Sequence, residues 1–149
     1  MIPVDTILTM WEKDCQIDDV ALDESSIRFA KIHAKYLSLL TESRLFLRRL
    51  EMELAGLRKD KFLYYNGKMT KEAMDAKGWP YDPFDGMTRP LRSDMDMFYS
   101  ADVDIQRLSG RAEYQKTINE ALEEIMGTLR WRHSVVKNVL DFRKFTSGG

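Results

Sequence analysis

The feature that most constrains this chain is a long segment without proline that contains a single glycine before its end. It begins at Asp23, a favourable N-cap, meets its first glycine at Gly56, and reaches a strong terminator only at Asn66-Gly67. A helix of about 40 residues would be about 60 Å long, and a helix of that length needs packing partners to be stable in water. The sequence therefore predicts a long helix over residues 23–67 that packs against other helices.

The apolar residues of this segment recur in alternating steps of three and four. They are Phe29, Tyr36, Leu40, Leu47, Leu50, Leu54, Leu57 and Tyr64, with His33, Ser43 and Lys61 at the remaining seam positions. A period close to 3.5 is typical of helices that pack in bundles and coiled coils. We therefore expect an all-α fold, a long-helix bundle with a coiled-coil-like protomer.

The remainder of the chain divides at a cluster of helix breakers. Five Gly or Pro residues between 78 and 90, interspersed with aromatic residues, predict an irregular loop over about 68–100 with one short helix near Thr70 to Ala76. Before the long helix, a short helix is expected from Thr6 to Asp14, capped by Asp5. We expect one domain over 1–149, made of an acidic N-terminal segment (1–22), a long basic helix (23–67), the loop (68–100) and a C-terminal long helix (101–145).

The C-terminal helix carries its own apolar stripe, and Ser100 or Asp102 is its expected cap. The stripe contains Ile105, Leu108, Ala112, Ile118, Leu122, Ile125, Leu129, Val136, Val139 and Leu140. Burying about ten such side chains between protomers would contribute roughly 15–30 kcal/mol before entropy is counted. We therefore expect a homo-oligomer whose interface includes Leu122, Ile125, Leu129, Val136 and Leu140.

Several classes of protein fit this sequence poorly. No apolar stretch of about 18 residues is present, so no membrane span is expected. A single cysteine and the lack of a signal peptide indicate the cytoplasm. There is no phosphate-cradling glycine loop, and the two histidines have no metal-ligand partner at a suitable spacing. We expect no metal, no cofactor and no enzymatic activity.

The charge is small overall but unevenly distributed. The net charge is −1, yet residues 28–61 hold nine Lys or Arg against four Asp or Glu. On a helical wheel Arg44, Arg48 and Lys59 form an outward basic track, whereas Arg58, Lys61 and Tyr65 lie on another face. Cations with flat rings suit single-stranded nucleic acid, but the same composition also suits the end of a coiled coil.

Three groups of residues resemble a known family. They are Ile17-Asp18 and Leu22 with Lys35-Tyr36, the run KDKFLYYNG at 59–67, and the later elements SADVD at 100–104 and DFRKF at 141–145. In this order they resemble the UvsY family, the recombination mediator proteins of T-even-type phages. The resemblance covers most of the chain, and the run at 59–67 together with the two later elements is its most specific part.

The resemblance implies a function and a set of partners. Members of the family bind single-stranded DNA, form closed homo-oligomeric rings of six or seven subunits, and load the phage strand-exchange recombinase onto DNA covered by single-strand-binding protein. It implies DNA contacts at Lys59 and Lys61, to which the pattern of charges adds Arg58, Arg44 and Arg48 and the pattern of rings adds Tyr65. The alternative is a helical phage structural or assembly adaptor that binds no nucleic acid. The host cytoplasm is the expected location in either case.

Overall fold

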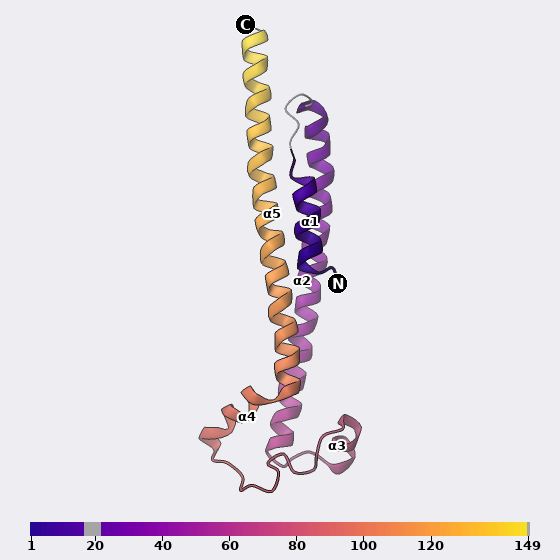
Figure 1. The fold of residues 1–149 in the computed structure, drawn as a ribbon, viewed down its shortest axis with the longest axis vertical. Helices are drawn as coiled ribbons and strands as arrows, with labels where there is room; N and C mark the ends of the chain where they lie inside the picture. Colours follow the sequence, from indigo (N-terminus) through magenta and orange to yellow (C-terminus); the bar gives the residue numbers. More distant parts are fainter. Residues whose placement is uncertain (17–21, 149) are drawn as a thin grey trace. The chain divides into compact units, whose positions relative to one another are not determined.

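The computed structural model describes residues 1–16 and 22–148, and for residues 22–26 it describes the backbone alone. Its elements are helices and one short 3₁₀ turn, with no strand in the described part, so the all-α prediction is confirmed. Figure 1 shows their order along the chain. They are α1 (Val4–Asp14), α2 (Leu22–Tyr65), α3 (Lys71–Lys77), η1 (Arg92–Asp94), α4 (Met95–Ala101) and α5 (Val103–Ser147).

Helix α2 ends at the terminator that the sequence predicts. Gly67 has a φ of 67°, a left-handed conformation that glycine adopts without steric cost. The N–H of Lys68 donates to the carbonyl of Leu63 at 2.9 Å, and that of Gly67 donates to the carbonyl of Tyr64 at 3.2 Å. These two bonds satisfy carbonyl groups that the helix end leaves without partners. Asp23 is predicted to cap the start of α2, but its side chain lies outside the described part.

Helix α5 begins after Asp102, one of the two predicted caps. Asp102 Oδ1 accepts hydrogen bonds from the backbone N–H groups of Asp104 and Ile105, each at 3.0 Å. A carboxylate at this position satisfies otherwise unpaired N–H groups and complements the positive end of the helix dipole. The local sequence therefore determines where α5 starts.

Two boundaries differ from the sequence-based expectation. Asp5 does not cap α1: the helix begins at Val4 after Pro3, and the Val4 N–H donates to the Tyr114 hydroxyl at 3.1 Å. An acceptor distant in sequence thus replaces the local cap. The loop at 68–100 also contains η1 and α4, which its proline and glycine content obscured. The short helix expected near Thr70 is confirmed as α3, with the Thr70 hydroxyl accepting from Ala73 N–H at 3.2 Å.

The chain divides into two compact units, and α2 and α5 contribute residues to both. Unit 1 comprises Met1–Leu47 and Tyr114–Gly149, and unit 2 comprises Arg48–Glu113. The single domain expected over 1–149 remains a prediction. In unit 1, α1 lies beside α2 and α5, and the apolar faces of the three helices meet in one core. Its buried members are Ile7, Phe29, Ile32, Tyr36, Leu40, Ile118, Leu122, Ile125, Met126, Leu129 and Val136.

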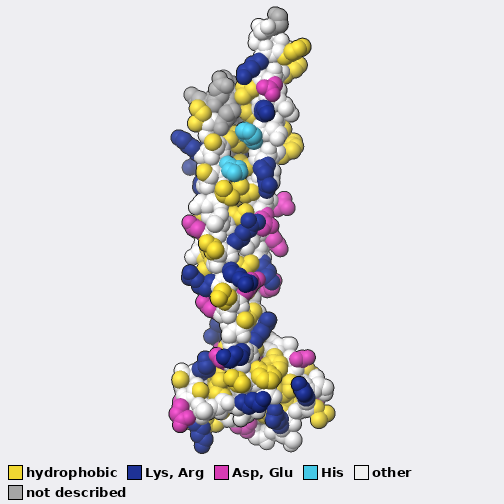
Figure 2. Space-filling model, turned by 180° about the vertical axis from the view of Figure 1, so that it is seen from behind, with side chains coloured by type: hydrophobic (Ala, Val, Ile, Leu, Met, Phe, Trp, Pro, Cys, Tyr) yellow, Lys and Arg dark blue, Asp and Glu magenta, His cyan; other side chains and the backbone are white. Residues whose placement is uncertain are grey.

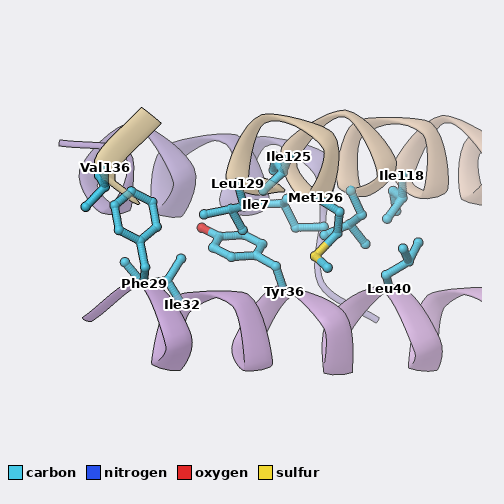
Figure 3. Packing of buried hydrophobic residues seen from close by; sticks show 11 residues of the cluster. Ile7, Phe29, Ile32, Tyr36, Leu40, Ile118, Ile125, Met126, Leu129 and Val136 are labelled. Atoms are coloured by element: carbon cyan, nitrogen blue, oxygen red, sulfur yellow. The ribbon is translucent and has the colours of Figure 1, made fainter. Parts of the chain in front are cut away.

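Figure 3 shows how α2 and α5 pair in this core. Phe29 lies near Val136 and Leu40 lies near Ile118, so the two helices run antiparallel there. The seam predicted for α2 is largely confirmed, because Phe29, Tyr36 and Leu40 are all buried. Val139, also predicted to belong to the apolar stripe of α5, lies at the edge of the buried face and is 38 % exposed.

Two polar clusters lie beside this apolar core, and the first of them is buried whereas the second reaches the surface. The Ser43 hydroxyl donates to Asn119 Oδ1 and accepts from Gln115 Nε2, and all three side chains are buried. Asp14 accepts from Lys35 Nζ at 2.6 Å and from the Tyr36 hydroxyl at 3.0 Å. The buried hydrogen bonds between Ser43 on α2 and the two residues on α5 favour one register of these helices over others.

None of the helices in 1–16 and 22–148 has an apolar stretch long enough to cross a bilayer.

Candidate nucleic-acid interface

The cationic run at the end of α2 belongs to unit 2, and its two lysines have different surroundings. Lys61 is 4 % exposed. Its ammonium lies 2.9 Å from Asp102 Oδ2 and 2.9 Å from Asp104 Oδ2, and 3.9 Å from the centroid of the Trp79 ring. Trp79 Nε1 donates to the same Asp104 oxygen at 3.1 Å. In this arrangement the charge of Lys61 is neutralised within the protein.

Asp102 is the centre of this cluster. One oxygen caps α5, and the other accepts from Lys61 and, at 2.7 Å, from the Tyr65 hydroxyl. Desolvation alone would raise the pKa of Asp102, but the hydrogen bonds from Ile105 N–H, Lys61 and Tyr65 and the charge of Lys61 outweigh it. The pKa of Asp102 is therefore lowered, and the carboxylate is held ionised between the end of α2 and the start of α5.

Tyr65, another predicted DNA contact, lies in an aromatic cluster of unit 2. Its ring centroid is 5.9 Å from that of Phe84 and 5.6 Å from that of Tyr99. Desolvation and the hydrogen bond to Asp102 both raise the pKa of Tyr65. The hydroxyl is thus committed to Asp102 and the ring to its neighbours. DNA contacts at Lys61 and Tyr65 stay predictions, and the geometry gives both side chains an internal role.

Arg58 and Lys59 differ from Lys61 in being exposed. Within the described residues neither forms an ion pair, so both charges face solvent. The other two predicted cations have partners: Arg44, in unit 1, lies 2.8 Å from Glu123, and Arg48, in unit 2, lies 3.8 Å from Glu51. These two pairs are exposed and therefore weak, so a polyanion can compete for either arginine. A DNA role for these four cations remains a prediction.

The residues predicted to form the oligomer interface occupy the core of unit 1. Leu122, Ile125, Leu129 and Val136 are buried against α1 and α2, and Leu140 packs at the edge of the same core. Their apolar surface is therefore already covered within one protomer, and their role between protomers stays a prediction. The sequence did not reveal this because a stripe that packs within a chain has the same period as one that packs between chains.

A second apolar stripe on α5 is exposed. Taking about 100° per residue, its five side chains fall within about 120° of one another, opposite the core stripe. Trp131 is 68 % exposed and Phe142 is 66 % exposed. The full stripe is Trp131, Val135, Val139, Phe142 and Phe145.

Sequence reasoning also missed cations from the segment after α2. Arg89 Nη2 donates to Asn66 Oδ1 at 2.8 Å, which brings this arginine to the end of α2. Lys68 Nζ lies 5.8 Å from the centroid of the Phe62 ring. No sequence signal paired Arg89 with Asn66, because the intervening turns are irregular. The turn at Gly67, which ends α2, brings Lys68 back toward Phe62 on the last turn of the helix.

The chain matches a family model over residues 10–149, described as recombination, repair and ssDNA binding protein UvsY. No curated protein resembles the chain closely enough to count as a match.

Crystal structures of the bacteriophage T4 recombination mediator protein UvsY share the fold of this chain. One of them, lattice type II, has a TM-score of 0.81 at 18 % identity, with 99 % of each chain covered. Lattice type IV has a TM-score of 0.76 at 17 % identity and covers 97 % of this chain and 99 % of that one. Because the family model spans nearly the whole sequence, the chain belongs to the UvsY family of recombination, repair and ssDNA binding proteins.

Proposed function

We propose that this protein is a single-stranded DNA-binding recombination mediator. In this role it helps load a phage strand-exchange recombinase onto single-stranded DNA that is covered by single-strand-binding protein. The observation that carries the proposal is the family match over residues 10–149. Exposed Arg58 and Lys59, which form no ion pair within the described residues, add a physical basis, because such cations release counterions when they meet phosphates.

The small number of free cations suits a mediator. A few phosphate contacts in each protomer make a weak, salt-sensitive site. In a homo-oligomer, binding at each further copy becomes intramolecular, so a long strand is held while each single contact still exchanges. A mediator must hold single-stranded DNA and then release it to the recombinase, and many weak contacts meet both needs.

Assembly into a homo-oligomer, with the ring of six or seven subunits that the resemblance implies, is part of the proposal. The exposed stripe of α5 supports it, since Trp131, Phe142 and Phe145 present large apolar surfaces to solvent. Contiguous exposed apolar surface is typical of sites that another protein surface covers. In a ring each protomer has two neighbours, so the two edges of the stripe would pack against the α5 helices on either side and be buried there.

A salt titration tests DNA binding. We expect Lys59→Ala to weaken binding to a dT oligonucleotide and to reduce the slope of log K against log[salt] by about 0.7, the contribution of one phosphate contact on a single strand. Arg58→Ala should have a similar effect. The matched control is Lys137→Ala, which removes an exposed cation of α5 in unit 1.

The outcome separates the two candidate functions. If the wild-type protein shows no salt-dependent binding to the oligonucleotide, the mediator proposal is wrong and the helical assembly adaptor is favoured. If Lys137→Ala weakens binding as much as Lys59→Ala, the site is not at the end of α2.

Loading needs an assay of its own. A labelled single-strand-binding protein is placed on single-stranded DNA, and its displacement by the recombinase is followed with and without this protein. We expect displacement to be faster with the wild-type protein and slower with Lys59→Ala at the same concentration. Equal rates with and without the protein would contradict the loading role while leaving DNA binding intact.

A further inference from the structure

Unit 2 contains two neighbouring hollows that share the side chains of Phe62 and Tyr99. One hollow has a volume of about 320 Å³ and is also lined by Arg58, Ser100 and Ile105. The other has a volume of about 790 Å³, and Lys68, Arg89 and Arg92 contribute to its lining. Figure 2 shows Lys and Arg side chains gathered around exposed hydrophobic surface in the part of unit 2 that carries α3 and α4. Two rings therefore lie where a mainly apolar hollow with one arginine meets a larger hollow with three cations.

Phe62 is unusually exposed for a phenylalanine near the end of a packed helix. It is 48 % exposed, whereas Lys61 beside it is buried. At about 100° per residue, Phe62 projects between Arg58, about 40° to one side, and Lys59, about 60° to the other. Lys68 Nζ approaches the same ring from beyond the end of α2. The ring is thus half exposed and has cations on several sides, while apolar side chains such as Ile105 and Met95 line the same hollows.

Asn66 holds the opposite wall in place. Its Nδ2 donates to the carbonyl of Phe62 at 2.7 Å and to the hydroxyl of Tyr99 at 3.1 Å. Its Oδ1 accepts from Arg89 at 2.8 Å. One side chain therefore fixes a tyrosine from α4 and an arginine from the preceding loop against the end of α2. A site whose groups are fixed before binding loses less entropy when its ligand arrives.

The charges around the hollows favour an anionic ligand. Four cations (Arg58, Lys68, Arg89 and Arg92) line them against one carboxylate, Asp96. Within the described residues none of these four forms an ion pair. Cations with an exposed ring between them match a phosphate backbone that carries flat bases. A single strand presents free base faces, whereas in a duplex those faces stack on each other.

We propose that Phe62 and Tyr99 form a base-stacking site for single-stranded DNA, with Arg58, Lys68 and Arg89 holding the flanking phosphates. The inference rests on the proposed function and adds to it a second kind of contact, one that recognises bases rather than charge. It also gives the segment after α2 a role, because Tyr99 and Arg89 both come from it. Stacking tolerates any base, which suits a protein that must act on strands of any sequence.

Two oligonucleotides of equal length and charge test the site, one carrying thymine bases and one abasic. We expect the wild-type protein to bind the base-bearing strand about tenfold more tightly, the effect of stacking a base on an aromatic ring. Phe62→Leu keeps the apolar bulk but removes the aromatic face, so it should lower affinity for the base-bearing strand about tenfold. Affinity for the abasic strand should not change. Phe62→Trp, which keeps an aromatic face, should retain the preference.

The results separate this inference from the proposed function. If the wild-type protein binds both strands equally with a clear salt dependence, the stacking site is wrong and DNA binding stands. If Phe62→Leu weakens both strands to the same extent, Phe62 only positions the cations, and the inference is again overturned. If the wild-type protein binds neither strand, the proposed function itself fails. Circular dichroism of each variant establishes that it is folded before affinities are compared.

Discussion

Lys59 and Lys61 are two positions apart, yet the fold gives them opposite environments. Residues two apart on a helix point about 160° away from each other. Lys61 lies on the packed side of α2 and meets two carboxylates and an indole ring, whereas Lys59 lies on the solvent side. A DNA strand that reaches Lys59 does not reach Lys61 without breaking that cluster. Substituting both together therefore confounds a change in stability with a change in binding.

The first prediction compares these lysines by their effect on stability. We expect Lys61→Met to lower the free energy of unfolding by about 3–5 kcal/mol, because it leaves the buried carboxylate of Asp102 without its counter-charge. Lys59→Met, at an exposed position, should change it by no more than about 0.5 kcal/mol. Urea denaturation measures both values. Equal effects of the two substitutions would contradict the buried ion cluster.

The second prediction concerns acid. Since the pKa of Asp102 is lower in the folded protein than in the unfolded chain, the unfolded state binds its proton first as the pH falls. The stabilisation from Asp102 is complete above the unfolded pKa of about 4 and is lost as the pH falls through the lower folded value. We expect Asp102→Asn to flatten the decline of unfolding free energy below about pH 4. Parallel curves for the two proteins would show that Asp102 contributes nothing.

At the scale of the elements, glycines have different roles according to where they stand. Gly67 has a positive φ and ends α2, whereas Gly56 lies inside α2 with open space where a Cβ would be. An alanine at Gly67 must adopt a left-handed conformation that costs about 1–2 kcal/mol. An alanine at Gly56 gains about 0.5–1 kcal/mol, because glycine loses more backbone entropy on folding.

The third prediction therefore pairs these two substitutions. We expect Gly67→Ala to lower the melting temperature and Gly56→Ala to raise it, as measured by circular dichroism. Both substitutions replace one hydrogen by a methyl group, so a difference between them reflects the position in the structure and not the chemical change. If Gly67→Ala raised the melting temperature, the left-handed end of α2 would be wrong.

At the scale of the whole molecule, two apolar stripes of α5 compete for the role of interface. The sequence led us to place Leu122, Ile125, Leu129, Val136 and Leu140 between protomers, but the fold buries most of them against α1 and α2. The stripe that includes Trp131 and Phe142 is exposed instead. One face of α5 thus forms part of the protomer core, and the other face is exposed, where we propose that a neighbouring protomer packs.

The fourth prediction tests this division. We expect Trp131→Ala with Phe142→Ala to reduce the oligomeric mass, measured by analytical ultracentrifugation, with little loss of helix content. Leu129→Ala should instead destabilise the fold by about 2–5 kcal/mol, because it leaves a cavity in the core. If Leu129→Ala dissociated the oligomer without destabilising it, the interface expected from the sequence would be restored.

The sequence by itself determined the all-α fold class, the presence of the two long helices α2 and α5, the end of α2 at Gly67 and the start of α5 after Asp102. These features depend on local chemistry, since helical period, capping carboxylates and a left-handed glycine act within a few residues. The seam of α2 followed from the same period, and so did the separation of Lys59 from Lys61. The family resemblance also followed from short runs of residues and is confirmed over 10–149.

Only the tertiary structure decided which partners these residues meet. Nothing local indicates that Lys61 binds Asp102 and Asp104, that Tyr114 supplies the first hydrogen bond of α1, or that Asn66 holds Arg89. Each contact joins residues 23 or more apart along the chain, and periodicity carries no information about such pairs. The long segments were readable because helical order repeats, while the placement of charge and of exposed rings depended on how the chain folds back on itself.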